Sequence, residues 1–207
     1  NLDYISGCRT TYWKGGMIHR IHGNLIHLMR GQIFNIDGKS FFTFGGGEST
    51  DKDMRLDNGL WWREEEPTPV EMAMGARALD EANKKVDYII THEPPSLVKS
   101  AMLLKNGDVD SVNKLNGFLD EIGKYCSYKQ WYFGSHHEDR RITPHHTCVF
   151  NKILPIDTYT YDPQSGAKQL SFFDDEPVPA ILNKKRFWSK TDLAWMSIGY
   201  VTQLTPI

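Results

Sequence analysis

The chain has 207 residues, of which 40% are apolar and 24% are charged. These fractions are typical of a globular protein and exclude a disordered chain or a fibre. The 24 Lys and Arg residues and 26 Asp and Glu residues give a net charge of −2, so the chain lacks the basic field that non-specific binding to nucleic acid requires. No segment approaches the roughly 20 apolar residues of a membrane-spanning helix. We therefore expect no membrane partner, and nucleic acid only as a substrate.

Three cysteines, Cys8, Cys126 and Cys148, lie far apart, and no Cys-x-x-Cys pair occurs. This usage supports neither a zinc knuckle nor a disulfide framework, and it predicts reduced thiols in a cytoplasmic protein. The sequence starts at Asn1, without an initiator Met or a signal segment. We therefore expect that residues have been removed or that the chain is a fragment.

The first part of the chain alternates apolar and polar residues with the period of β-strands. This pattern predicts strands at 17–22, 25–29, 32–36 and 40–44. Asp37-Gly38 is a strong signal for a two-residue hairpin turn between the last two strands. Gly45 to Gly47 ends the last strand, and the polar residues 48–59 predict an irregular loop.

Helices and strands alternate in the remainder of the chain. Apolar stripes at helical spacing predict a helix from Pro69 to Ala82 and another over 110–125. Short apolar runs predict strands at 86–91, 130–133, 147–153, 158–161 and 169–173, with a turn at 162–166 between the last two. This alternation, together with the hairpins, predicts an α/β protein with mixed sheets.

The tail after Pro179 differs in composition from the preceding sequence and carries four aromatic residues, Phe187, Trp188, Trp195 and Tyr200. We expect it to pack on another surface. The sequence therefore predicts a main domain at 1–157, followed at 158–207 by a hairpin and an aromatic-rich extension.

Two histidine-containing segments directly follow predicted apolar strands. His92 comes after the strand at 86–91, and His137 comes shortly after the strand at 130–133. Ligands of α/β sheets bind beyond the carboxyl ends of the strands, and imidazole is the commonest metal-binding side chain. If the two strands are neighbours, both imidazoles can face one ion.

Other polar features have simpler interpretations. The remaining histidines are typical of surface or hydrogen-bonded core residues, among them His19, His22, His27, His145 and His146. Glu64 to Glu66 is interpreted as a solvated acidic run near a helix start. The glycines at 45–47 lack the Lys-Ser/Thr ending of a P-loop, and no G-x-S-x-G motif occurs.

The two histidine segments together resemble a known family. Thr91-His92-Glu93-Pro94-Pro95 and Phe133-Gly134-Ser135-His136-His137 are similar to the last two motif blocks of the calcineurin-like metallophosphoesterases. Further stretches resemble a bacterial branch of that family: 26–31, 41–47 followed by Asp51-Lys52, and Trp61-Trp62. The resemblance covers residues 1–156.

The resemblance implies a four-layer α/β/β/α sandwich of mixed sheets that holds two divalent ions, manganese, iron or zinc. It also implies hydrolysis of a phosphate mono- or diester by two-metal catalysis. By position, His92 matches a ligand of one metal and His137 a ligand of the other. Ser135 stands where the family has a further histidine, and His136 replaces that ligand only if the backbone changes direction locally.

The family's first three motif blocks, which supply a bridging Asp, further ligands and a catalytic His, are absent. The resemblance therefore covers the C-terminal two-thirds of the family's domain, without its N-terminal strands, and catalytic residues stay unassigned. Two histidines cannot hold two dications, since each ion needs several ligands. We expect this chain alone to bind metal weakly, with a missing N-terminal segment or a partner chain supplying the rest.

Phosphate-ester oxygens are expected to pair with guanidinium groups, and Arg55 and the pair Arg140-Arg141 are the candidates. An alternative function belongs to a different class. The chain is then a non-catalytic interaction module that keeps the metallophosphoesterase fold, its metal site having decayed. In that case the aromatic residues after Pro179 form the contact surface.

Overall fold

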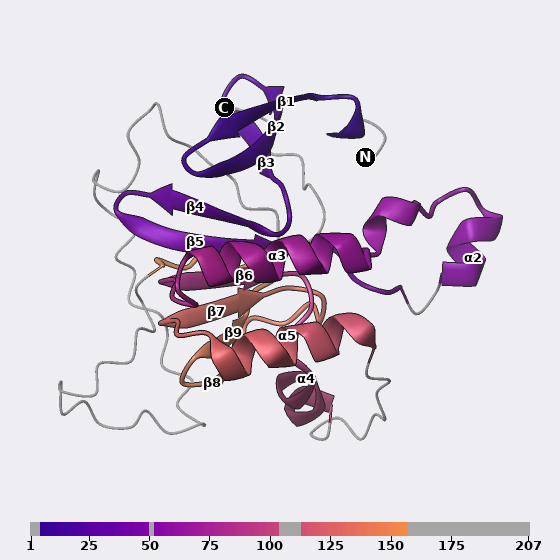
Figure 1. Ribbon diagram of the computed structural model, residues 1–207. Helices are drawn as coiled ribbons and strands as arrows, with labels where there is room; N and C mark the ends of the chain where they lie inside the picture. Colours follow the sequence, from indigo (N-terminus) through magenta and orange to yellow (C-terminus); the bar gives the residue numbers. More distant parts are fainter. Residues whose placement is uncertain (1–4, 50–51, 104–112, 157–207) are drawn as a thin grey trace.

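The computed structural model describes residues 5–49, 52–103 and 113–156 (Figure 1). The strands and turn expected between 158 and 173, the aromatic extension and the boundary at 157/158 lie outside the described residues. The described part is an α/β fold with two sheets, as the alternation of helices and strands predicted.

The larger sheet has six strands in the order β4-β5-β6-β7-β9-β8. Its central strands β5, β6, β7 and β9 are parallel, and the edge strands β4 and β8 are antiparallel to their neighbours. The sheet is therefore mixed, as predicted. The strands are β4 (Gln32–Ile36), β5 (Lys39–Phe44), β6 (Tyr88–Thr91), β7 (Gln130–Phe133), β8 (Arg140–Thr143) and β9 (His146–Cys148).

A second, antiparallel sheet is formed by three strands at the start of the chain, β1 (Arg9–Trp13), β2 (Gly16–His22) and β3 (Leu25–Leu28). Its buried residues Ile18, Ile26 and Leu28 pack on one face of the larger sheet. The larger sheet contributes alternate residues to this core, Phe34, Ile36, Phe41, Tyr88, Ile90 and Tyr132, because side chains of a strand point to its two faces in turn.

The opposite face of the larger sheet is covered by helices α3 (Pro69–Glu81), α4 (Ser96–Leu103) and α5 (Lys114–Tyr125) (Figure 1). The sheet residues between those of the first core lie here, among them Phe42, Phe44, Ile89, Trp131 and Phe133. Buried Leu and Met residues of the helices complete this core, including Leu79, Met102, Leu115 and Leu119. The described residues thus form three layers, helices on a sheet on a sheet.

The helix starts are capped locally. Thr68 precedes Pro69, and its hydroxyl accepts a hydrogen bond from the backbone N–H of Glu71, whose side chain bonds back to Thr68. Asn113 and Asn116 form the equivalent reciprocal pair at α5. Such capping boxes satisfy backbone donors that have no partner within the helix. They explain why the two predicted helices begin where they do.

The strands predicted at 17–22, 25–29, 32–36, 40–44, 86–91 and 130–133 and the helix from Pro69 are confirmed within a few residues. The prediction of an irregular loop at 48–59 was wrong, because this segment contains the helix α2 (Lys52–Asp57). The strand expected at 147–153 is the shorter β9. The strands β1 and β8 and the helix α4 were not predicted.

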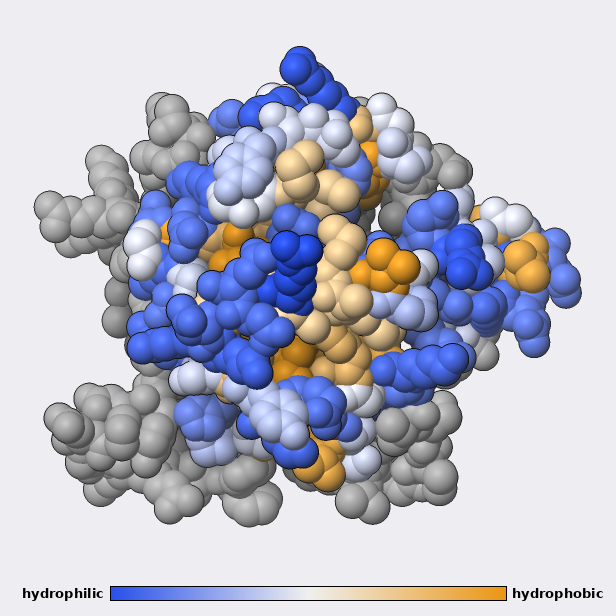
Figure 2. Space-filling model, viewed as in Figure 1, coloured by the Kyte–Doolittle hydropathy of each residue, from blue (hydrophilic) through white to orange (hydrophobic). Residues whose placement is uncertain are grey.

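The helix α2 projects from the rest of the described structure and buries none of its side chains (Figure 1). Figure 2 shows apolar surface in the middle of the helix-covered face, with polar residues around it, and a mixture of both on the projection. In the part of the chain that the structure describes, every helix is too short or too polar to cross a membrane.

Candidate functional site

The candidate site lies at the carboxyl edge of the larger sheet. β5, β6 and β7 run parallel, and their registers align Phe44 with Thr91 and Thr91 with Phe133. The three strands therefore end at the same level. The segments that follow them, 45–47, 92–93 and 134–137, meet at this edge, which is where parallel α/β sheets bind ligands.

His92 lies between the ends of the neighbouring strands. Its backbone N–H donates to the carbonyl of Phe44 at 3.3 Å, and its carbonyl accepts from the N–H of Gly134 at 3.1 Å. A Cβ atom on Gly47 would lie 2.9 Å from Cδ2 of the imidazole. Gly47 therefore lets the glycine segment approach the half-buried His92 side chain closely.

Three hydrogen bonds fix the backbone that carries His92. Trp131 donates its Nε1 hydrogen to Thr91 Oγ1 at 2.8 Å, and this hydroxyl donates in turn to the carbonyl of Glu93 at 2.6 Å. Asn116 of α5 donates to the carbonyl of Pro94 at 3.0 Å. These buried polar contacts hold the backbone on both sides of His92 in place.

Glu93 forms a largely buried ion pair beside His92. Its Oε2 lies 3.5 Å from Nζ of Lys99, with 9% and 13% of the two side chains exposed. Glu93 Oε2 accepts no hydrogen bond from the described residues. A carboxylate held in this way places negative charge next to the imidazole, which the sequence alone did not reveal.

The segment after β7 bends away from strand geometry. Ser135 and His137 have left-handed φ angles of 43° and 52°, and the N–H of His136 donates back to the carbonyl of Gly134 at 2.6 Å. This is the local change of backbone that a contribution from His136 requires. The His136 ring lies against the edge of Phe133, with centroids 6.4 Å apart at 90°.

His137 is exposed, but a neighbouring aromatic ring covers one of its faces. Its imidazole lies parallel to the ring of Phe150, with centroids 4.6 Å apart and planes at 20°. Asp139 accepts hydrogen bonds from the backbone N–H groups of Phe150, Asn151 and Lys152 at 2.8, 3.0 and 3.1 Å. The loop after β9 is therefore tied to the segment after β7.

The pKa of His92 is affected by burial and by four neighbouring charged or titratable side chains. Burial lowers the pKa of His92; Glu93 and Glu65 act in the opposite direction, while His136 and His137 lower it further. His92 is therefore neutral at neutral pH, and one of its ring nitrogens keeps a lone pair for a ligand or a proton. His136 and His137 are therefore near enough to His92 to affect its pKa.

Glu65 differs from the solvated residue that the acidic run predicted. Its carboxylate lies 3.2 Å from Arg55 Nη1 and 3.4 Å from Ser49 Oγ, and its side chain is 16% exposed. Arg55, a candidate for phosphate contact, thus already has a carboxylate partner at the site. Arg140, the other candidate, lies on β8 and pairs with Glu138 at 3.2 Å.

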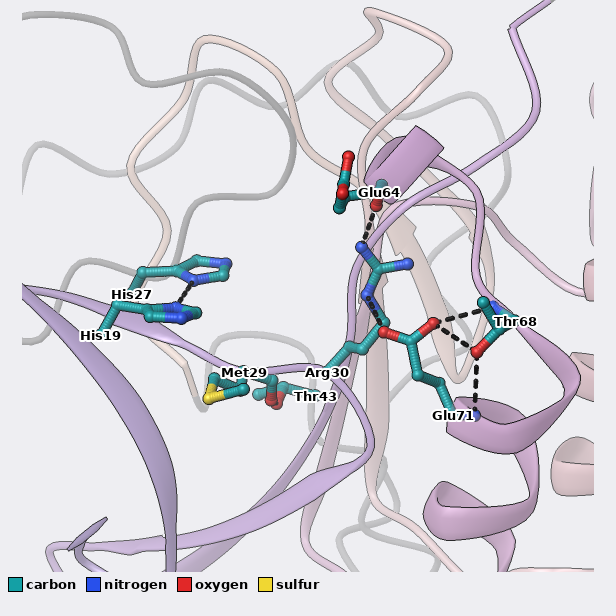
Figure 3. A network of polar contacts seen from close by, with 8 residues as sticks. All are labelled: His19, His27, Met29, Arg30, Thr43, Glu64, Thr68 and Glu71. Atoms are coloured by element: carbon teal, nitrogen blue, oxygen red, sulfur yellow. Dashed lines mark hydrogen bonds and ion pairs between the residues drawn. The ribbon is translucent and has the colours of Figure 1, made fainter. Parts of the chain in front are cut away.

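Arg30 lies between Glu64 and Glu71 and contacts both (Figure 3). It comes from the connection between β3 and β4, donates Nη2 to the carbonyl of Glu64, and lies 3.5 Å through Nε from Glu71. A Cβ atom on Gly46, which has φ of 95°, would lie 2.8 Å from Arg30 Nη1. Arg30 therefore links the 3₁₀ turn η1 (Arg63–Glu65) to α3 and lies close to Gly46.

The other histidines lie away from this edge. His19 and His27 are cross-strand partners in the small sheet, with Nδ1 atoms 3.0 Å apart (Figure 3). His145 and His146 lie at the amino end of β9, where His146 Nε2 is 3.2 Å from Tyr128 Oη. His22 is exposed at the end of β2. These placements agree with the interpretation of the five histidines as surface or hydrogen-bonded core residues.

Among the described residues, no three His, Cys, Asp or Glu side chains lie close enough together to hold a metal ion. The buried Ser135 Oγ has no hydrogen-bond partner there either. The residues of this edge therefore do not by themselves fit a centre of two ions. They can supply at most the histidine ligands of such a centre.

No protein-family model, curated protein or solved structure matches this chain.

Proposed function

We propose that this chain is part of a metal-dependent phosphoesterase of the calcineurin-like type, which hydrolyses a phosphate mono- or diester. One observation carries the proposal: the segments that contain His92 and the pair His136-His137 follow the carboxyl ends of the neighbouring parallel strands β6 and β7. Imidazole side chains at such an edge are suited to binding a divalent ion such as Mn²⁺, Fe²⁺ or Zn²⁺.

The proposal includes a four-layer architecture. The described helices, the six-stranded sheet and the three-stranded sheet supply three layers in the order α/β/β. In the proposed complete domain, a second helical layer covers the outer face of the small sheet.

Two dications repel each other, and three imidazoles carry no charge to offset this repulsion. The proposed centre therefore needs carboxylate donors from outside the described residues, from an N-terminal segment or a partner chain. The role proposed for His92, His136 and His137 is to supply nitrogen ligands. Arg55 and Arg140 are already paired with Glu65 and Glu138, so each has only its other guanidinium N–H groups to offer to a phosphate oxygen.

Calorimetric titration with Mn²⁺ and Zn²⁺ tests the proposal. We expect weak binding that falls about ten-fold or more in His92→Ala and in His137→Ala, since each variant removes a nitrogen ligand. His22→Ala is the matched control, because this histidine is exposed in the small sheet. Equal binding by the wild type and His92→Ala would contradict the proposal. Hydrolysis of 4-nitrophenyl phosphate with Mn²⁺ is measured on the same variants.

One observation favours the alternative, a non-catalytic interaction module. The described residues lack a group of three metal-binding side chains, and Ser135 cannot replace an imidazole ligand. This alternative predicts no stoichiometric ion and no effect of His92→Ala on ion binding. It also predicts a partner chain whose binding is lost when residues 180–207 are deleted, so the two functions give opposite results.

A further inference from the structure

We propose that Phe150 forms an aromatic subsite next to His137, and that the ligand of this site is a phosphate ester carrying a flat aromatic group. A nucleobase or an aryl ring is the class of substituent that fits. The inference rests on the proposed function, because it takes the phosphate to lie at His92, His136 and His137.

The contact between Phe150 and His137 fixes where this subsite lies. Their rings are parallel at a centroid distance of 4.6 Å, so Phe150 is one ring thickness away from a proposed ligand-binding imidazole. Phe150 follows β9 by two residues, and the N–H of Val149 donates to the carbonyl of Phe133 at 2.9 Å. The phenylalanine therefore stands at the same carboxyl edge as the histidines.

Phe150 keeps an open surface although His137 covers part of it. Half of its area, 50%, is exposed to solvent. An exposed aromatic ring is a stacking platform for any flat ligand, because every base or aryl group has a π-face. An aliphatic phosphate ester has no such face, so it gains only general apolar contact from the same ring.

The platform is also rigid. Asp139 accepts hydrogen bonds from the backbone N–H groups of three successive residues, Phe150, Asn151 and Lys152. The ring is thus held before a ligand arrives, which lowers the entropy that binding must overcome. A loop without such an anchor would offer the same ring in many orientations.

The acidic residues between His137 and Arg140 do not oppose an anionic ligand strongly. The carboxylate of Glu138 is paired with Arg140 at 3.2 Å. The carboxylate of Asp139 is occupied by the three N–H groups of the loop. Both charges are therefore partly compensated by partners on the chain itself.

Phenyl phosphate and n-butyl phosphate are the probes for this subsite. They carry the same phosphate, but only the first has a flat ring attached to it. Dissociation constants for the 207-residue chain are measured by calorimetry with Mn²⁺ present. We expect phenyl phosphate to bind about five-fold more tightly, since base–aromatic stacking is of that order even at partly exposed sites.

Substitutions at position 150 then measure how much the ring of Phe150 contributes to the preference for phenyl phosphate. Phe150→Leu keeps apolar bulk and should equalise the two dissociation constants, as should Phe150→Ala, whereas Phe150→Trp should keep or increase the preference. Tyr125→Ala is the matched control: this residue is 54% exposed at the end of α5, at the opposite edge of the sheet. It should leave both constants unchanged.

The outcomes separate the two proposals. If both esters bind equally and both weaken in His92→Ala, the aromatic subsite is wrong and the phosphoesterase proposal stands. If the preference survives in Phe150→Leu, or if phenol binds as well as phenyl phosphate, the subsite is also wrong. If neither ester binds, both proposals are wrong.

Discussion

A Cβ atom on Gly47 would lie 2.9 Å from Cδ2 of His92, closer than Cβ atoms come to other heavy atoms in folded proteins. The same atom would lie 3.2 Å from Cγ of Glu93. Gly47, in the segment after β5, thus leaves the space that the imidazole after β6 occupies. A side chain at position 47 must displace His92 or the loop itself.

We therefore expect Gly47→Ala to lower the affinity for Zn²⁺ several-fold, because His92 is moved from its place. Gly45→Ala is the matched control, since a Cβ atom there meets nothing within 4 Å. Calorimetric titration of both variants compares the affinities, and urea unfolding verifies that each is folded. Equal affinities in the two variants would show that His92 does not bind the ion.

Thr91 connects the core to the loop of the site. Its hydroxyl accepts from Trp131 Nε1 and donates to the carbonyl of Glu93. Thr91→Val keeps the shape but leaves the buried indole N–H unpaired, which costs about 1–3 kcal/mol of unfolding free energy. Thr91→Ser keeps the hydroxyl and should cost less. Urea unfolding followed by tryptophan fluorescence measures the difference, and a neutral Thr91→Val would contradict the role of this bond.

Local patterns predicted the elements that bury a regular face. Alternation and the Asp37-Gly38 turn identified the hairpin of β4 and β5, and helical spacing with Pro69 identified α3. The position of His92 and His137 after the strand ends could also be predicted from the sequence. A residue that follows a buried strand of a parallel sheet lies at the carboxyl edge of that sheet.

The remaining features depend on contacts between distant residues. The helix α2 buries no side chain, so its sequence has no apolar pattern at helical spacing from which it could be predicted. Glu65 reads as part of a solvated acidic run, but its charge is matched by Arg55, ten positions earlier. Phe150 stacks on His137, and its backbone N–H donates to Asp139. A single sequence carries no signal for such pairings.

Asp139 gives a third prediction. Burial alone would raise its pKa, but the N–H groups of Phe150, Lys152 and Asn151 outweigh this effect and lower the pKa. Asp139→Ala removes all of these bonds, so Phe150 should leave the ring of His137. The ring-current shift of the His137 protons in NMR spectra should then diminish. Asp139→Asn keeps one acceptor oxygen and should retain part of the shift; an unchanged shift in Asp139→Ala would contradict the anchoring role.

The stability of the protein should depend on pH through two histidines outside the candidate site. Burial, and secondarily the neighbouring His145, lower the pKa of His146 to about 4. Burial lowers the pKa of His27 to about 4 as well, with smaller contributions from His19 and Arg30. In the unfolded chain both groups titrate near their usual pKa of about 6.5.

Between these pKa values the unfolded state binds protons that the native state does not, so the free energy of unfolding falls as the pH falls. The free energy of unfolding is highest above about pH 6.5, where both histidines are neutral in the folded and the unfolded chain. It decreases as the pH falls to about 4, by about 2–3 kcal/mol for each histidine. Urea unfolding at about pH 7.5 and about pH 4.5 measures the loss. His146→Gln and His27→Gln should each reduce it, and the double variant should reduce it additively, because the residues lie in different sheets. An equal loss in the wild type and the double variant would show that neither imidazole is kept neutral by the fold.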